Sequence, residues 1–242
     1  MGKRDFLMGL WSLASAYRVF TEVGQLYIHS DGTLDAGDEH VIHRLFPSAR
    51  VADSRMFLQD FGDRLKNFPE LLKFRSTYRK FQTRIIDQHF IGDSEIRLFL
   101  DSDLLWFREP KELMQAIRNG VPRPLMMSNA EYIRMEFRDG TSTDDRTSRP
   151  NGGIVLYQRE QMNMDRMEEF LQKSDYLGKR FGDQAWMAWT LRPDLLPEDT
   201  YIIKGTLTDT IIVRHYTSPQ RLKFYFYGIN KIARDILEAC VR

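Results

Sequence analysis

The spacing of apolar residues along the chain alternates between the period of a helix, about 3.6 residues, and that of a strand, about two residues. This alternation predicts a succession of helices and strands. A first helix is expected over 5–20, where Phe6, Leu10, Leu13 and Tyr17 share one face. Other helices are expected at 35–46, over most of 54–90, and at 110–118, 162–172, 183–191 and 229–241. Strands are expected at 26–29, 49–52, 96–100, 154–157, 201–203 and 211–213. This order predicts an α/β fold with a mainly parallel sheet flanked by helices, in a single domain over 1–242.

The most informative stretch is the apolar segment 96–100, which ends at Asp101 and is followed by Ser102 and Asp103. A short β-branched and aromatic run between polar segments indicates a buried strand. Its C-terminal end is where open α/β sheets bind ligands. Two close carboxylates repel each other, and a divalent cation shared with phosphates removes that conflict. The stretch therefore predicts a metal-bound diphosphate, and the alternative is a solvated turn in which Ser102 or Asp103 caps the next segment.

Composition narrows the function classes. The chain has 35 basic and 34 acidic residues, so its net charge gives no overall attraction to nucleic acid or to an anionic membrane. The single Cys240 excludes an internal disulfide framework and fits a reducing compartment, so a cytoplasmic location is expected. No apolar run is long enough to cross a bilayer, and no signal peptide is recognisable.

Further ligands for a cation or a diphosphate follow other predicted elements. His215 comes just after the strand 211–213, and a neutral imidazole can join carboxylates on Mn²⁺, although a lone histidine is often structural. Arg221 and Lys223 come next and are candidates to stabilise a departing diphosphate, with a solvated basic turn as the alternative. Lys80 is expected to reach the same site from the helix before the central strand.

Three further polar features are interpreted from the local sequence. Arg84 is expected to pair with Asp87 at helical spacing on the protein surface. The segment 139–150 is polar and is expected to form a mobile flap. Asp183 opens a helix, so it is either an N-cap or, together with Gln184, a contact to sugar hydroxyls.

Asn151-Gly152-Gly153 leads into the strand 154–157. Glycines let the backbone come close to a ligand, and an asparagine amide can both donate and accept hydrogen bonds. An ordinary turn at the start of a strand is the alternative. A different motif, at 29–33, is similar to the Asp-x-Asp-Gly-Thr of haloacid dehalogenase phosphatases. His29 stands in place of the nucleophilic aspartate, so covalent phosphotransfer there would fail.

In this order, the residues resemble those of nucleotide-sugar glycosyltransferases of the GT-A fold, especially the family 8-like group. The resemblance rests on the strand with Asp101-Ser102-Asp103, on Asn151-Gly152-Gly153, on Asp183-Gln184, and on His215 with Arg221 and Lys223. It implies that Asp103 and His215 bind Mn²⁺ or Mg²⁺, with Asp101 on the metal or the ribose. It also implies that Asn151, Asp183 and Gln184 line the sugar and acceptor side, and we take Asp183 and Gln184 as the candidate catalytic residues. The candidate donor-binding residues are Asp101, Asn151, Gly152, Lys80, Arg221 and Lys223.

Two departures from the resemblance are visible. The family begins with a strand that holds the nucleotide base, whereas here a helix begins almost at Met1, so an N-terminally truncated form is expected. The segment 217–223 stands where the family has Gly-x-x-Lys-Pro-Trp.

The predicted function is metal-dependent transfer of a sugar from a nucleotide sugar, with a UDP-sugar as the first expectation, to an acceptor hydroxyl. The acceptor is a carbohydrate or another hydroxyl compound. The resemblance favours retention, and an inverting reaction would use Asp183 as the base. The alternatives are a non-catalytic nucleotide-sugar or carbohydrate-binding protein and a metal-dependent phosphatase.

Overall fold

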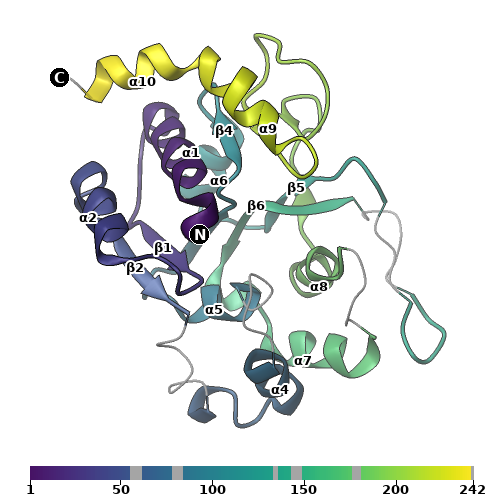
Figure 1. Cartoon of the computed structure of the whole chain (residues 1–242). Helices are drawn as coiled ribbons and strands as arrows, with labels where there is room; N and C mark the ends of the chain where they lie inside the picture. The colour runs from purple at the N-terminus through teal and green to yellow at the C-terminus, as the bar shows by residue number, and fades with distance from the viewer. Residues whose placement is uncertain (55–61, 78–83, 133–135, 143–148, 176–180, 241–242) are drawn as a thin grey trace.

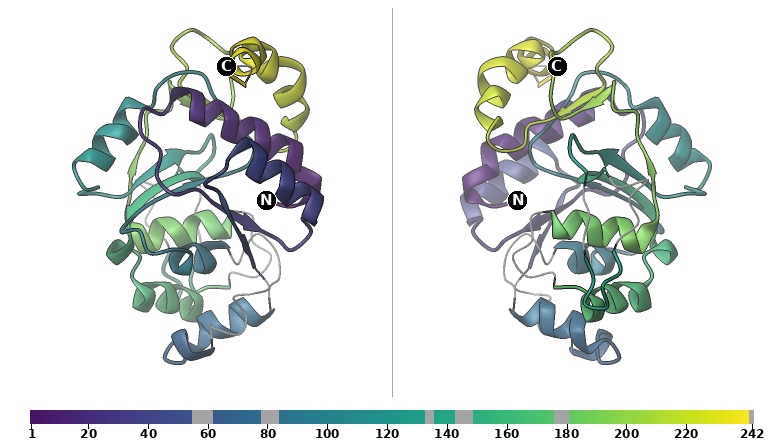
Figure 2. Two further views of the ribbon diagram at one scale, coloured as in Figure 1. Left: turned by 90° about the vertical axis from the view of Figure 1, so that its left-hand side faces the viewer. Right: turned by 90° about the vertical axis from the view of Figure 1, so that its right-hand side faces the viewer.

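The computed structural model describes residues 1–54, 62–77, 84–132, 136–142, 149–175 and 181–240. Helices lie on both sides of short β-sheets (Figure 1). Figure 2 shows α1 (Phe6–Val19) and α2 (Ala36–Leu45) on one side of the strands and α8 (Gly182–Leu191) with its neighbouring helices on the other. The α/β class predicted from the sequence is confirmed. The predicted flap and Lys80 fall wholly or mainly outside the described residues.

On the first side, a 3₁₀ turn at Lys3–Asp5 leads into α1 (Phe6–Val19), and α2 (Ala36–Leu45) follows. The start of α2 is fixed by a capping box, because Asp35 and Asp38 each accept a 3.0 Å hydrogen bond from the other's backbone N–H. The parallel strands β1 (Tyr27–Ser30) and β2 (Arg50–Asp53) flank α2 in sequence.

The remaining helices and strands build the larger part of the molecule. The helices are α4 (Pro69–Thr77), α5 (Arg84–Phe90), α6 (Lys111–Arg118), α7 (Met164–Lys173), α8 (Gly182–Leu191), α9 (Arg221–Lys223) and α10 (Ala233–Cys240). One sheet has the order β3 (Ile96–Leu100), β6 (Pro150–Gln158), β5 (Leu125–Ser128) and β7 (Asp194–Leu195). Another has the order β4 (Leu104–Trp106), β9 (Val213–His215) and β8 (Tyr201–Ile202).

The expectation of a mainly parallel sheet is wrong. Among the described residues β1–β2, β5–β7 and β8–β9 pair in parallel, whereas β3–β6, β4–β9 and β5–β6 are antiparallel. Alternation of helices and strands in the sequence does not fix direction, because a strand may return to the sheet through a loop as well as through a helix. The longest strand, β6, is antiparallel to both of its neighbours.

The strand β6 separates the two main parts of the core. Val155 and Tyr157 point to the cluster formed with α4, α5, α7 and α8. Ile154 and Leu156 point to the other cluster, which includes residues of α1, α6 and β4. Successive side chains of a strand point to opposite faces, so β6 is apolar at every one of these positions because both of its faces are covered.

Helix α1 lies across the strands of both larger sheets. Its Ser15 hydroxyl accepts a 3.1 Å hydrogen bond from the Trp106 backbone N–H, and Phe20 meets the Trp106 ring edge-on at 4.9 Å between centroids. On its other side, Leu10 joins the cluster around Ile28 of β1. In the described part of the chain, β1 pairs with β2 alone and β3 pairs with β6 alone. The suggestion of a truncated N-terminus stays a prediction.

Two strand boundaries differ from the sequence prediction in ways that matter for function. Strand β6 begins at Pro150, so Asn151, Gly152 and Gly153 belong to the strand and not to a turn before it. The register with β5 shifts there, since Met126 faces Val155 but Met127 faces Asn151. Strand β9 ends at His215, so this histidine lies inside the sheet rather than beyond it.

Candidate metal and donor site

The segment Asp101-Ser102-Asp103 links the two larger sheets, since β3 ends just before it and β4 begins just after it. The Asp101 N–H donates a 2.8 Å hydrogen bond to the Gly153 carbonyl of β6, and the Tyr216 N–H donates one of 2.8 Å to the Asp103 carbonyl. Leu104 pairs with His215 across β4 and β9. Backbone pairing therefore brings Asp101, Asp103 and His215 to one point, although His215 is more than a hundred residues away in sequence.

The three side chains form a compact group whose ligand atoms all lie within 4.8 Å of one another. The His215 Nε2 atom is 2.9 Å from Asp103 Oδ1 and 3.5 Å from Asp101 Oδ2. The side chains of Asp101, Asp103 and His215 are 18%, 14% and 4% exposed. Two carboxylates and an imidazole at this spacing are a possible metal-binding group, and their donor atoms suit Mn²⁺ or Mg²⁺.

Asn151 determines which ring nitrogen of His215 faces the aspartates. Its Oδ1 atom accepts a 2.9 Å hydrogen bond from the Gly153 N–H and lies 2.8 Å from His215 Nδ1. An amide oxygen can only accept, so the proton of a neutral His215 must be on Nδ1. The Nε2 lone pair of that neutral ring is then directed at Asp103.

In this arrangement two hydrogen-bond acceptors, His215 Nε2 and Asp103 Oδ1, face each other. A bare Nε2 and an ionised carboxylate at 2.9 Å repel each other unless a cation or a proton lies between them. Burial lowers the pKa of His215, but the charge and hydrogen bond of Asp103 outweigh burial, and the net shift of the pKa is upward. The upward shift favours a proton between the two groups when no metal ion is present. A divalent cation at the same position would also remove the repulsion, so the three residues fit such a cation.

The two aspartates are inequivalent. Burial raises the pKa of Asp101, and the nearby charge of Asp103 adds to this, so the net shift is upward despite Arg84. Burial also acts on Asp103, but the charge and hydrogen bond of His215 outweigh it, and the pKa of Asp103 is lowered. Asp103 is therefore the carboxylate that keeps its charge most firmly.

Gly153 is required by the position of His215. A Cβ atom at residue 153 would lie against His215 Nδ1, 2.6 Å from His215 Cε1 and 2.8 Å from Asn151 Oδ1. Gly152 is also crowded, because a Cβ there would lie 2.9 Å from Met187 Cε and 3.5 Å from Arg84 Nη2. The two glycines thus allow the histidine and the helices α5 and α8 to approach β6 closely.

Two arginines border the group of Asp101, Asp103 and His215, which we call the acidic group. Arg84 donates from Nη1 to Asp101 Oδ1, and its Nη2 is 3.6 Å from Asp183 Oδ2. The guanidinium also lies over the Phe99 ring, 5.0 Å from its centroid. Arg221 places Nε 3.3 Å from Asp103 Oδ2 and Nη1 3.0 Å from Asp5 Oδ1. The acidic group is thus held by one cation on each side.

Sequence reasoning missed the role of Arg84. Its spacing suggested a local pair with Asp87, but Asp87 is fully buried and accepts from Arg75 at 2.5 Å, and it contacts His29 at 2.8 Å. The only available signal was that Arg84 opens a helix immediately before the central strand. That position does not reveal which strand end the side chain reaches.

The other predicted site residues fall in different places. Asp183 lies in the first turn of α8 but does not cap it, because its carboxylate is directed at Arg84 and the N-cap residue is Phe181. The Gln184 Oε1 atom accepts a 3.1 Å hydrogen bond from Asn129. Lys223 is exposed, and the described structure shows no contact between it and the acidic group.

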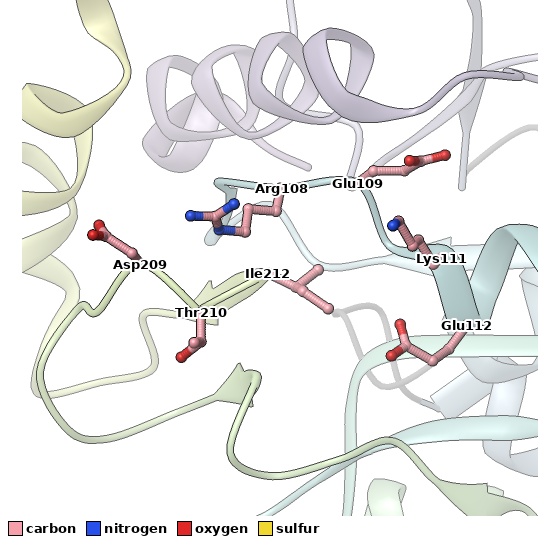
Figure 3. Close-up of a pocket in the computed structure, with 7 residues that line it drawn as sticks. All are labelled: Arg108, Glu109, Lys111, Glu112, Asp209, Thr210 and Ile212. Atoms are coloured by element: carbon pink, nitrogen blue, oxygen red, sulfur yellow. The ribbon is translucent and has the colours of Figure 1, made fainter.

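A separate hollow of about 610 Å³ is lined by seven residues at the far end of the β4–β9 pair (Figure 3). The Phe107 and Arg108 N–H groups both donate to the Ile212 carbonyl there. Figure 3 shows the side chains of Arg108, Lys111 and Glu112 on one wall, and Asp209 and Thr210 on a separate loop. It shares no residue with the acidic group, and its charges are of both signs, so it favours no class of ligand.

Comparison with known proteins gives a clear result for the fold alone. No protein-family model matches the chain, and no curated protein matches it by sequence. Among solved structures, mouse xyloside xylosyltransferase 1 in its apo form is 11% identical, with 89% of this chain and 93% of that chain covered and a TM-score of 0.57. The galactosyltransferase LgtC, in complex with donor and acceptor sugar analogues, is 14% identical, with 89% and 84% covered and a TM-score of 0.58.

The bifunctional glycosyltransferase WbbM is 14% identical with a TM-score of 0.58, and the match covers 98% of this chain and half (50%) of that chain. A further LgtC structure carries a glutamine-to-glutamate substitution described as an active-site mutation. The chain therefore has the GT-A glycosyltransferase fold. Sequence identities this low carry the fold and leave the reaction to be argued from the residues.

Proposed function

We propose that this protein is a metal-dependent glycosyltransferase that moves a sugar from a nucleoside diphosphate sugar to an acceptor hydroxyl. We also propose that residues 1–242 act as one domain and that the location is cytoplasmic. None of the described helices is long and apolar enough to cross a bilayer. The fold and the acidic group support the proposal together.

One observation carries the proposal. His215 and Asp103 point two acceptors at each other, and Asn151 prevents the histidine from relieving this by changing tautomer. A site in which a neutral imidazole and an ionised carboxylate repel each other, and in which a cation removes the repulsion, suits a cation. Asp101 is the third ligand candidate, and Mn²⁺ or Mg²⁺ is the proposed ion. When bound, the ion would supply positive charge for a donor diphosphate.

The chain's own residues would bind and orient the donor. Arg221 lies beside Asp103, where its guanidinium can bind phosphate oxygens and stabilise the charge that a departing diphosphate gains. Arg84 holds Asp101 and Asp183 in place from one guanidinium. Asn151 serves as the group that orients His215 rather than as a direct donor ligand.

The sugar side of the site is proposed to be the region where Gly152 faces Arg84 and α8. The first turn of α8 presents Asp183 and Gln184 there. The Asp183 carboxylate is directed at the Arg84 guanidinium, with 3.6 Å between Oδ2 and Nη2. This favours a retaining reaction, in which the leaving phosphate takes the acceptor proton and no enzymic base is required. Gln184, held by Asn129, is the group that can contact a sugar hydroxyl.

The test is nucleotide release from a panel of nucleotide sugars with Mn²⁺ or Mg²⁺, with UDP-sugars first and with simple sugars as acceptors. Asp103→Asn should abolish metal-dependent release, whereas Asp165→Asn, on the exposed start of α7, should leave it unchanged. Equal release by the Asp103→Asn variant would remove the metal role. Donor binding by calorimetry without release from the wild type would instead identify a binding protein.

A further inference from the structure

An exposed apolar patch lies on the C-terminal side of the molecule. It consists of Leu222, Phe226 and Tyr227, whose exposed fractions are 68%, 66% and 67%. We call these three residues the aromatic patch. Figure 1 shows the segment from α9 to α10 along one edge of the molecule, beside α1. Side chains of this size are rarely left in water together without a partner.

The three residues lie on one continuous helical segment, in which α9 runs directly into the next turn. Residues Phe224–Gly228 form a π-helical turn, in which the Ile229 N–H donates to the Phe224 carbonyl. Leu222 lies in α9 just before this turn, and side chains four positions apart on a helix are neighbours, so helical spacing puts Leu222 and Phe226 on one face, with Tyr227 next in the chain.

The opposite side of this turn is fixed to the core. Phe224 is fully buried against Tyr216, 5.4 Å between ring centroids. A Cβ atom at Gly228 would lie 2.5 Å from Leu105 Cδ1. The turn that carries the aromatic patch is therefore anchored to the core, so the patch does not belong to a detached chain end.

The charge around the aromatic patch is positive. Lys223 and Lys231 are exposed, and neither forms an ion pair with another residue that the structure describes. The nearby acidic residues are already neutralised, since Asp235 pairs with Arg18 at 2.9 Å and Glu238 pairs with Arg234 at 2.8 Å.

We propose that the aromatic patch, with Lys223 and Lys231, docks the protein on an anionic membrane surface. Phenylalanine and tyrosine insert at the level of lipid headgroups, and lysine chains extend along an apolar surface while their charge meets anionic lipid. The combination of exposed aromatic groups with exposed lysines favours a membrane over an apolar protein partner, because lysine is depleted at the cores of protein interfaces.

The position of the aromatic patch relates it to the candidate site. Arg221, the residue before Leu222, contacts Asp103. The residue that precedes the patch in the chain therefore reaches the acidic group. The docking itself does not depend on the proposed transfer reaction, and the test requires neither donor nor metal.

The experiment is co-sedimentation of the full chain with vesicles of phosphatidylcholine and phosphatidylserine, and with vesicles of phosphatidylcholine alone. We expect binding to the anionic vesicles that weakens with added salt. Replacing both aromatic residues, Phe226→Ser with Tyr227→Ser, should weaken binding at least about tenfold because the inserted apolar area is lost. Lys223→Gln should weaken it about fivefold.

Matched controls use exposed residues elsewhere. Leu45→Ser, on α2, and Lys66→Gln should bind like the wild type. Circular dichroism of the double variant confirms that its fold is retained. The proposal is overturned if the wild type does not bind anionic vesicles, or if the double variant binds as well as the wild type. It is also overturned if the patch variant changes only self-association in analytical ultracentrifugation, which would identify a protein interface.

Discussion

The Nδ1 atom of His215 and the Oδ1 atom of Asn151 lie 2.8 Å apart, and this contact sets the proton on one side of the imidazole. The opposite nitrogen is thereby presented to Asp103. A residue that orients a metal ligand through a hydrogen bond commonly has a strong influence on metal affinity.

Asn151→Ala should therefore lower the affinity for Mn²⁺ by about 10- to 100-fold, because His215 loses the acceptor that fixes its tautomer and orientation. Isothermal titration with Mn²⁺ measures this directly. Asn119→Ala, an exposed residue after α6, is the matched control and should leave the affinity unchanged. An unchanged affinity in the Asn151 variant would show that His215 does not bind the ion through Nε2.

Gly153→Ala should destabilise the protein by about 1–3 kcal/mol and displace His215, because the added methyl group meets the imidazole and the Asn151 amide. Chemical denaturation and the Mn²⁺-induced shift in melting temperature report the two effects. Gly24→Ala provides the control, since a Cβ there meets nothing within 4 Å. If the Gly153 variant kept both full stability and the full metal response, the close approach of His215 to β6 would be contradicted.

The stabilising effect of Mn²⁺ should grow as pH rises from about 6 to about 8. The pKa of His215 is raised above its ordinary value of 6.5, so in the metal-free protein its protonated form adds stability at low pH that is lost as pH rises through the raised pKa. A metal ion needs the neutral imidazole and must displace that proton, so its affinity rises over the same interval.

The measurement is the melting temperature with and without Mn²⁺ across this pH range. In a His215→Asn variant the metal-induced shift should be small and should depend little on pH. A wild-type shift that stayed constant with pH would mean that His215 does not exchange a proton for the ion.

Arg84→Met should have two opposite effects. Removing the guanidinium leaves Asp101 and Asp183 without their shared cation and should destabilise the metal-free protein by about 1–3 kcal/mol. The same change removes a positive charge that competes with the ion for Asp101, so the affinity for Mn²⁺ should rise. Denaturation without metal and titration with Mn²⁺ test the two signs separately.

The control for Arg84→Met is Arg123→Met, whose pair with Asp194 lies on the surface, with both side chains largely exposed. Exposed pairs contribute little, so stability and metal affinity should both stay close to wild type. A fall in Mn²⁺ affinity in the Arg84 variant would mean that the arginine helps to build the metal site rather than competing for its ligand.

Several features followed from local sequence alone. The apolar strand that ends at Asp101 and Asp103 was confirmed as β3, since short-range patterning determines both its extent and its polar end. Helices α2, α7 and α8 were placed to within about two residues because caps and periodicity are local properties. The order of residues also marked His215, which the structure brings to the two aspartates.

Other features required the tertiary structure. Strand direction was mispredicted, because antiparallel and parallel neighbours leave the same pattern on a strand that is buried on both faces. Arg84 was assigned to Asp87 by helical spacing, whereas the buried Arg75 pairs with that carboxylate and Arg84 pairs with Asp101. The sequence pattern does not indicate which of the two arginines, Arg75 or Arg84, pairs with the buried Asp87.

By itself, the sequence determined the α/β fold and the position of a strand that ends in two carboxylates, since periodicity, caps and polar strand ends act over a few neighbouring residues. The tertiary structure decided how those carboxylates are used. Pairing between β4 and β9 and between β3 and β6 brings His215, Asn151 and Gly153 to them, and a choice of tautomer or cation exists only where distant groups meet at hydrogen-bond distance.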